Sequence, residues 1–479
     1  MKPSFPARIY IAALVLRLIP VLLTRSLGIG LDDMFQYDML ARSLAAGNGY
    51  RWYAQDDLHL VQNYFETLNF QIPADYDPRG VLTSFRPPLY PAFLALIYFL
   101  TGSGEGRFFT VRIAQAFLSA ALAPLIFLIG CKTFPENERA AKIAAWIIAL
   151  YPLLVVYPLS LATENLFFVL VLLSVLTLLK AGETRSAKHF ILAGALIGLT
   201  ALTRSVFLAF GGLSVLWIFF GLRERQKAAL LFLTVTLVTL PWMIRNSIMH
   251  RQVTGIESAL GYDLYVGYHP ESSGTFQYGI SLDMMPYLDD GERDEIGRAQ
   301  AFEFMRADPG RIPYLALRRL GHFFGLERRA LSFFYSSNFF GYIPTRLLLT
   351  IAFIVLMPFV VVSAFATFGI ALAKWNHQTV LLALVMAGYL APHILILGED
   401  RFHLTLIPFL AIFAAHCWTG GLTALSACWK KSFMGKTALS LAVCSVLLLF
   451  LNWGLELARD ADKISQLLGP NGNQTYFPY

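Results

Sequence analysis

Residues 165–180 read NLFFVLVLLSVLTLLK, and no charged side chain precedes the final Lys180. A helix needs about 20 mostly apolar residues to cross a bilayer, and this run supplies most of them. Similar runs, most of them separated by short polar breaks, recur at 9–27, 88–101, 108–130, 140–158, 189–203, 205–221, 228–248, 346–373, 379–397, 403–421 and 437–453. The pattern predicts an all-α polytopic membrane protein.

The composition excludes several other classes of protein. Of the 479 residues, 56% are hydrophobic and 14% are charged, whereas a soluble domain has about 25% charged residues. The same composition excludes disorder over most of the chain. Four cysteines are too few for a small disulfide scaffold. The net charge of +7 has no clustered basic face, so we expect no nucleic-acid partner.

Basic residues predict which loops face the cytoplasm. They cluster at 2–8, 132–142, 185–188, 223–227, 374 and 430–436, and the positive-inside rule places these clusters inside. The loop 28–87 then lies outside, and an odd number of crossings must separate it from the basic loop at 131–142. The short run at 88–101 opens with Pro87-Pro88, so we expect it to lie along the outer leaflet without crossing.

This assignment predicts eleven transmembrane helices, within a range of 10 to 13, and a cytoplasmic N-terminus. One transmembrane domain covers residues 1–453, with long external loops at 28–107 and 249–345 that contain interfacial helices. Residues 454–479 form a short external tail. Loops of this length usually carry function.

Carboxylates stand at two points on the predicted outer face. Asp32 and Asp33 precede a helical pattern that ends at Gly47-Asn48-Gly49. Aspartate commonly caps a helix start, but a carboxylate at the membrane surface can also act on a lipid head group. Asp38, one turn further on, is expected to be solvated or capping. Glu164 can cap the following helix, bind the acceptor or bind a metal ion.

Arginines on the outer face run against the positive-inside bias. Arg86 precedes the 88–101 run, and Arg204, Arg245 and Arg401 stand at the outer ends of different spans. A guanidinium fork binds phosphate, so an anionic lipid ligand would account for them. For Arg86, snorkelling is the alternative. Arg17 lies mid-span, where either a function or packing against a carbonyl would explain it.

Several of these segments, taken in order, resemble a known family. They are the acidic pair, LARSLAAGNGY (40–50), FRPPLYP (85–91), ATENLFF (162–168), GLTALTR (198–204), PWMIRN (241–246) and EDRFHLTLIP (399–408). Their order and sidedness resemble the GT-C class of membrane glycosyltransferases over roughly residues 9–420. The nearest likeness is to dolichyl-phosphate-mannose–protein mannosyltransferases and aminoarabinose (lipid A) transferases.

The resemblance implies a sugar transfer from a polyprenyl-phosphate donor to a lipid, glycan or protein acceptor, at the external face of the plasma (inner) membrane. Asp33 aligns with the expected catalytic aspartate of the first loop, but Met34 stands where the family has glutamate. Asp32 is kept as a second catalytic candidate. The candidate substrate-binding residues are Tyr37, Arg86, Glu164, Arg204, Arg245, Asn246, Arg401 and His403.

The residues suit this chemistry without the family. The leaving phosphate is weakly basic, so it needs charge stabilisation more than a general acid. The acceptor hydroxyl needs a general base, which a carboxylate supplies, and direct attack would invert the anomeric carbon. The histidines show no metal-ligand spacing, so no metal is assigned and a divalent ion is left open as a cofactor.

A transporter or flippase of lipid-linked sugars is the alternative. Transporters tend to have repeated halves and polar helices that meet at mid-membrane. Here the polar residues gather at one face and in long external loops, which favours the enzyme.

Overall fold

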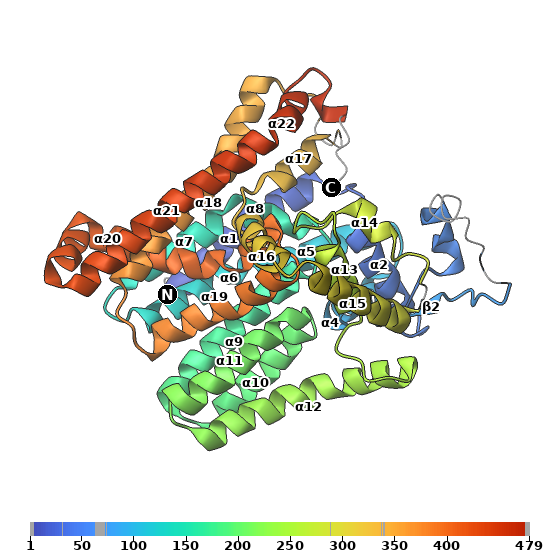
Figure 1. The fold of residues 1–479 in the computed structure, drawn as a ribbon, viewed down its shortest axis with the longest axis horizontal. Helices are drawn as coiled ribbons and strands as arrows, with labels where there is room; N and C mark the ends of the chain where they lie inside the picture. The colour runs from blue at the N-terminus through green and yellow to red at the C-terminus, as the bar shows by residue number, and fades with distance from the viewer. Residues whose placement is uncertain are drawn as a thin grey trace.

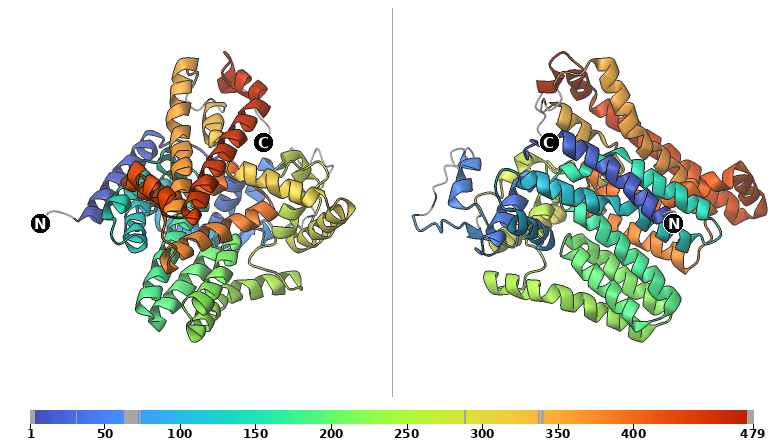
Figure 2. Two further views of the ribbon diagram at one scale, coloured as in Figure 1. Left: turned by 60° about the vertical axis from the view of Figure 1, so that its left-hand side comes forward. Right: turned by 180° about the vertical axis from the view of Figure 1, so that it is seen from behind.

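The computed structural model describes residues 4–30, 32–62, 72, 74–287, 289–336, 338 and 341–474. Within these residues the only strands are β1 (Arg51–Trp52) and β2 (Val81–Leu82), which pair antiparallel. The remaining elements are helices, which the two further views show from other sides (Figure 2). The predicted all-α class is confirmed.

Helices make up most of the molecule (Figure 1). Eight helical segments in the described residues are long and apolar enough to cross a membrane. They are α1 (Phe5–Leu23), α5 with α6 (Arg107–Ala120 and Leu122–Thr133), α9 (Glu164–Thr184), α12 (Arg225–His250), α18 (Thr345–Leu372), α19 (His377–Leu395), α20 (Ile407–Lys431) and α21 (Phe433–Arg459).

A further segment qualifies as a bent pair. Helix α7 (Glu138–Leu150) is followed by α8 (Pro152–Val156) and the 3₁₀ turn η2 (Tyr157–Leu159), and the two parts meet at 54°. Pro152 lacks the N–H that would continue the hydrogen bonding of α7, which explains the break.

Two predicted spans coincide with shorter apolar helices. These are α10 (Ala187–Ala201) and the segment of η3 (Ser205–Phe207), α11 (Leu208–Leu216) and η4 (Trp217–Gly221). The polytopic class is confirmed, while the count of eleven crossings stays a prediction. The predicted boundary of the tail at residue 453 falls inside α21.

The run at 88–101 forms the 13-residue helix α4 (Leu89–Thr101). At about 1.5 Å per residue it is roughly 20 Å long, which is too short to cross the hydrocarbon core. It packs against α2 (Asp32–Ala45) of the same external loop. This length and contact agree with a helix that lies at the membrane surface.

Several elements of the two long loops, α2, α4, α13 (Leu260–Tyr268), α14 (Tyr278–Leu282) and α15 (Asp290–Ala307), lie toward one side of the molecule, on the right in Figure 1. The same loops also contain η1 (Gln55–Leu60), α16 (Arg311–Phe323) and α17 (Arg328–Ser336). The 3₁₀ turn η5 (Asp400–Thr405) joins α19 to α20, and α22 (Ala461–Leu467) and η6 (Gly472–Gln474) follow α21.

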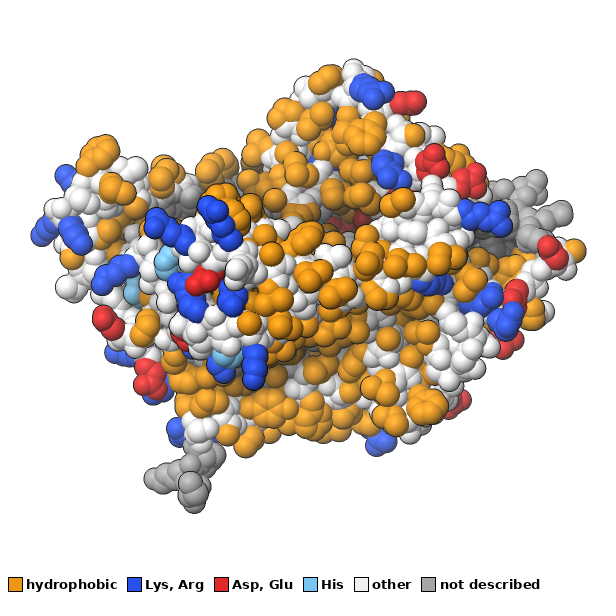
Figure 3. Space-filling model, turned by 90° about the horizontal axis from the view of Figure 1, so that it is seen from below, with side chains coloured by type: hydrophobic (Ala, Val, Ile, Leu, Met, Phe, Trp, Pro, Cys, Tyr) orange, Lys and Arg blue, Asp and Glu red, His pale blue; other side chains and the backbone are white. Residues whose placement is uncertain are grey.

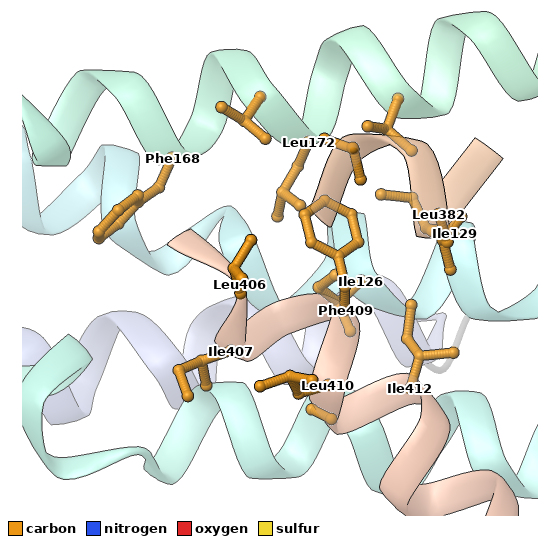
Figure 4. Close-up of a cluster of buried hydrophobic side chains, with 14 of the residues drawn as sticks. Ile126, Ile129, Phe168, Leu172, Leu382, Leu406, Ile407, Phe409, Leu410 and Ile412 are labelled. Carbon is orange, nitrogen blue, oxygen red and sulfur yellow. The ribbon is translucent and has the colours of Figure 1, made fainter. Parts of the chain in front are cut away.

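Helix α20 lies at the centre of the core. Its first nine residues, 407–415, are all buried, and it packs against α18 and α7. Phe409 and Leu410 lie among apolar side chains such as Leu172 and Leu382 (Figure 4). A Cβ at Gly369 of α18 would lie 1.9 Å from a backbone oxygen of α20, so this close approach requires glycine.

The mid-span Arg17 is explained by packing. It is fully buried, and its guanidinium donates to the Ser119 hydroxyl at 2.8 Å and to the carbonyl oxygens of Ala149 and Ile148 at 3.2 and 3.1 Å. The carbonyl alternative of the sequence analysis is therefore confirmed. The residue joins α1, α5 and α7.

The outer surface has the distribution that a bilayer requires. Hydrophobic side chains cover a broad middle band of the molecule, and most charged side chains lie toward its ends (Figure 3). Exposed leucines and phenylalanines are numerous on α12, α18 and α21. Apolar side chains exposed over such an area are typical of a surface that lies against lipid.

We expect residue 104, between α4 and α5, to face the outside. Gly104 is exposed, and a Cβ there meets nothing within 4 Å, so Gly104→Cys should leave the fold intact. In a background without native cysteines, a membrane-impermeant maleimide should label this variant in intact cells. Lys188→Cys, in a predicted cytoplasmic loop, is the control and should react only after permeabilisation. The reverse pattern would mean that the eleven-span topology is wrong.

Candidate active site

Helix α2 positions the first carboxylate of the site. Met34, Tyr37 and Ala41 lie on one face and pack against residues of α4. The helix is followed by Gly47 and Gly49, both with positive φ (75° and 84°), as predicted for its stop. Asp33 therefore stands in the first turn of a helix that is anchored along its length.

Asp33 lies between two guanidinium groups from distant parts of the chain. Arg86 Nη2 pairs with Asp33 Oδ1, and Arg401 Nη2 lies 3.4 Å from Asp33 Oδ2. Arg86 Nε also donates to Gln36 at 2.8 Å, one turn along α2. The side chain of Asp33 is 31% exposed. Arg86 and Arg401, which lie far apart in the sequence, thus meet at one carboxylate in the structure.

These arginines control the ionisation of Asp33. Burial raises the pKa of its carboxyl, but the positive charges of Arg86, Arg401 and Arg204 outweigh burial and hold the pKa below its ordinary value. Asp33 is therefore ionised throughout the neutral pH range.

A second buried ion pair lies beside the first. Arg204, between α10 and η3, donates from Nη1 to Glu164 Oε1 at 2.6 Å, and both side chains are largely buried. Glu164 begins α9 and Arg204 follows the end of α10, so the ends of these two helices meet here. Tyr37 contributes its ring, 5.6 Å from the Arg86 guanidinium.

Sequence reasoning missed a third set of charges. Glu399 is buried and lies 3.1 Å from Arg401 Nε and 3.0 Å from Arg329 Nη1. Glu399 stands within the EDRFH segment singled out above, but no local signal pointed to Arg329. Arg401 is thus held between Glu399 and Asp33.

Two further carboxylates were missed in the second external loop. Glu257 accepts from the Ser205 hydroxyl, next to Arg204. Burial and the nearby charge of Glu257 raise the pKa of Asp263 to about 7, against the lowering influence of Arg86. No side-chain hydrogen bond or ion pair of Asp263 is present in the described part of the chain. Neither residue lies in a recognisable motif.

Arg245 and Asn246 hold backbone segments. Arg245 Nη1 donates to the Thr83 carbonyl at 2.6 Å, and its guanidinium lies over the Trp242 ring. Asn246 is fully buried and donates to the carbonyl oxygens of Gly255 and Ile256. Their predicted contact with substrate stays a prediction, and the contacts in the structure assign them to loop anchoring.

His403 does not face the site surface. It is fully buried, with Nδ1 2.7 Å from the Phe323 carbonyl oxygen and Nε2 3.0 Å from Glu327 Oε1. A group without exposed surface cannot touch a substrate in this conformation, so the predicted binding role is not supported by its position. The 3₁₀ geometry of η5 turns His403 inward while Arg401 points outward, a distinction that spacing alone does not reveal.

The structure differs from the expectation that Asp38 is solvated or caps a helix. It is buried, not solvated, and accepts from Tyr98 Oη and Arg107 Nε at 2.8 Å each and from Arg42 Nε at 2.9 Å. These bonds tie α2 to α4 and α5. The side chain of Asp32 lies outside the described part of the structure.

The described residues hold no group of three histidine, cysteine or acidic side chains suited to a metal ion. The carboxylates Asp33, Glu164 and Glu399 each have an arginine partner instead. A cation would have to displace or oppose these guanidinium charges, so we derive no step through a metal.

Residues 85–245 match the family described as dolichyl-phosphate-mannose-protein mannosyltransferase. The matched segment contains Arg86, Glu164 and Arg204 and excludes Asp33 and Arg401. For this part of the chain the resemblance that the motifs predict is confirmed, and it supports the glycosyltransferase class. A search of curated proteins finds no match.

The chain is also similar to several solved structures. An Archaeoglobus fulgidus oligosaccharyltransferase in the apo form has 16% identity and a TM-score of 0.49, with 100% of this chain and 60% of that one covered. This chain therefore spans about 60% of the length of that protein. ArnT from Cupriavidus metallidurans bound to undecaprenyl phosphate has 14% identity and a TM-score of 0.40, with 88% and 79% covered.

Removing only one partner of the Arg204–Glu164 pair should destabilise the protein strongly. We expect Arg204→Met to lower the free energy of unfolding by about 3–5 kcal/mol, because Glu164 is left buried and unpaired. Adding Glu164→Gln should recover most of that loss. Chemical denaturation in mild detergent measures both. Lys132→Met is the control: its partner Glu183 is 39% exposed, so a change of under about 1 kcal/mol is expected. Equal losses in the single and double variants would show that the pairing is energetically irrelevant.

Proposed function

We propose that the chain is a membrane glycosyltransferase that moves a sugar from a polyprenyl-phosphate donor to an acceptor hydroxyl, with inversion. One observation carries the proposal: Arg86, Arg204 and Arg401, from three separate segments, converge on the carboxylates of Asp33 and Glu164. The family match over 85–245 supports the same class. The proposed location is the external face of the plasma (inner) membrane, and the acceptor is a lipid, a glycan or a protein.

In this proposal the donor phosphate competes with carboxylates for the arginines. Arg401 is 38% exposed and its contact with Asp33 is long, at 3.4 Å, so it is the guanidinium most easily transferred to a phosphate. A guanidinium fork offers two parallel hydrogen bonds to phosphate oxygens. When the C1–O bond of the donor breaks, the electron pair leaves with the polyprenyl phosphate, whose charge the arginines stabilise.

The acceptor proton goes to an aspartate. Asp33 is the residue predicted from sequence, and it is ionised in the neutral range, so it is ready to accept a proton once the phosphate has drawn its arginines away. The acceptor oxygen then attacks the anomeric carbon on the side opposite the phosphate, which inverts the configuration. General-base catalysis of this kind contributes about 10²–10⁴-fold to rate.

The transporter alternative is less well supported. Transport sites usually lie near the bilayer midplane, where interrupted helices meet. The paired charges here lie instead among α2, η5 and the outer ends of α9 and α10. The mid-span Arg17 is fully used in packing.

Arg401→Lys should weaken donor binding while the fold survives. Lysine keeps the charge but loses the fork that reaches Asp33 and Glu399 together. We expect the donor KM to rise about tenfold, the size of one lost charge-assisted hydrogen bond. The measurement is transfer from a panel of radiolabelled polyprenyl-phosphate sugars in membranes. An unchanged KM and kcat would reduce Arg401 to a structural ion-pair partner.

Asp33→Asn should abolish most transfer without weakening donor binding, because it removes the competitor of the phosphate. The expected fall in kcat is about 10²–10⁴-fold. In the wild type, kcat/KM should be flat between about pH 5 and 8, because the lowered pKa keeps Asp33 ionised in the free enzyme. Glu295→Gln, an exposed site on α15, should change neither quantity.

A different pH profile would point to another base. The pKa of Asp263 is about 7, so a base at this position would make kcat/KM rise through pH 7 as its carboxyl ionises. If that rise is found, and if it vanishes in Asp263→Asn but survives in Asp33→Asn, the assignment of Asp33 as the base is wrong.

A further inference from the structure

Two segments that lie far apart in the chain are joined twice near Arg401. One is residues 326–329, at the start of α17, and the other is residues 399–403, which includes η5. One of the two links is buried in the core and the other lies at the surface of the proposed site.

The buried link is the pair of Glu327 and His403, whose side chains are 1% and 0% exposed. His403 Nε2 lies 3.0 Å from Glu327 Oε1, and Tyr151 Oη donates to the same oxygen at 2.6 Å. Because a carbonyl oxygen carries no hydrogen, His403 Nδ1 must donate to Phe323. The imidazole is also stacked on the Phe359 ring, with centroids 4.0 Å apart. His403 is therefore held on both nitrogens and on one face.

The surface link is made by Arg329, Glu399 and Arg401. Glu399 lies 3.0 Å from Arg329 Nη1 and 3.1 Å from Arg401 Nε. Arg329 follows Glu327 by two residues, and Arg401 precedes His403 by two. Each residue of the buried pair is therefore separated by two positions in the sequence from one of the two arginines of the surface link.

Surface ion pairs alone hold a side chain weakly, because water and salt screen them and the side chain loses entropy. Arg401 and Arg329 are 38% and 35% exposed, although Glu399 between them is only 4% exposed. The turn η5 is only six residues long, so it has little stability of its own. The buried link therefore adds to the contacts that orient Arg401.

We propose that the Glu327–His403 pair is a positioning device that fixes η5 so that the guanidinium of Arg401 stays at Asp33. The proposal rests on the proposed function only in naming a donor phosphate as the ligand of Arg401. A buried, hydrogen-bonded polar pair contributes little net stability compared with apolar packing of the same volume, and its best-attested role is to specify one arrangement. Glu327 and His403 are thus positioning residues, and neither touches the substrate.

The first test replaces the pair by apolar groups of similar volume, Glu327→Leu with His403→Phe, so that no buried charge is left alone and the fold is kept. Full-length protein in nanodiscs is titrated with undecaprenyl phosphate. We expect affinity to fall about 10–100-fold, as misplaced binding groups do. Glu327→Gln keeps an oxygen for Tyr151 and His403 and should stay close to the wild type.

Ser119→Ala is the matched control, because it removes a buried hydrogen bond of Arg17 that involves neither η5 nor residues 326–329. It should not change phosphate affinity. A merely structural role for Glu327 and His403 would make the apolar double variant behave like this control, and that result would overturn the proposal.

The second test is coupling to Arg401. In an Arg401→Lys background the apolar double variant should cause little further loss of affinity, because the group that it misplaces is already impaired. In an Arg86→Lys background, the apolar double variant should cause the same loss of affinity as it does in the wild type. Equal effects in both backgrounds would overturn the positioning role.

A third measurement needs no ligand. Phenylglyoxal modifies arginine, and mass spectrometry follows its rate at Arg401. The rate should rise in the apolar double variant and stay unchanged in Ser119→Ala. If wild-type protein binds no undecaprenyl phosphate, the proposed function fails, but a raised modification rate still supports the positioning role and an unchanged rate still overturns it.

Discussion

The contact on which the site depends is the carboxylate of Asp33 held between the guanidinium groups of Arg86 and Arg401. Charges near a bilayer are poorly solvated, so they must be paired or bound by a ligand. Asp33 lies in the loop after α1 and Arg401 lies in the turn between α19 and α20, 368 residues further along the chain. The pairing therefore joins segments from distant parts of the chain.

The same constraint makes the site a candidate for phosphate. A carboxylate and a phosphate offer a guanidinium similar oxygen acceptors, so Asp33 and Glu164 occupy the arginines in a way that an anionic head group can take over. Such a site is organised before its ligand arrives, which lowers the reorganisation that binding requires. This organisation lowers the stability of the fold, because buried ion pairs contribute little more to it than apolar packing does.

Rigidity around the site comes from polar contacts that have no substrate role in the structure. Asp38 ties α2 to α4 and α5, Asn246 holds the 255–256 backbone, and Glu327 with His403 fixes the turn that carries Arg401. Sequence reasoning grouped Asn246 and His403 with the binding residues, because a polar side chain in a loop near a motif has the same local pattern in either role.

The sequence by itself determined the class of the protein. Long apolar runs and basic loops follow from the cost of placing charge in lipid, which acts on each segment separately, so the polytopic helical class and the short helix at 89–101 were predictable. The outer arginines could be recognised for the same reason. Only the tertiary structure decided which of them meet a carboxylate. Glu257, Asp263, Glu399 and Arg329 join the site through contacts between distant segments, and the inward turn of His403 depends on the geometry of η5. Such contacts depend on how separate helices pack, and a local pattern of residues carries no information about that packing.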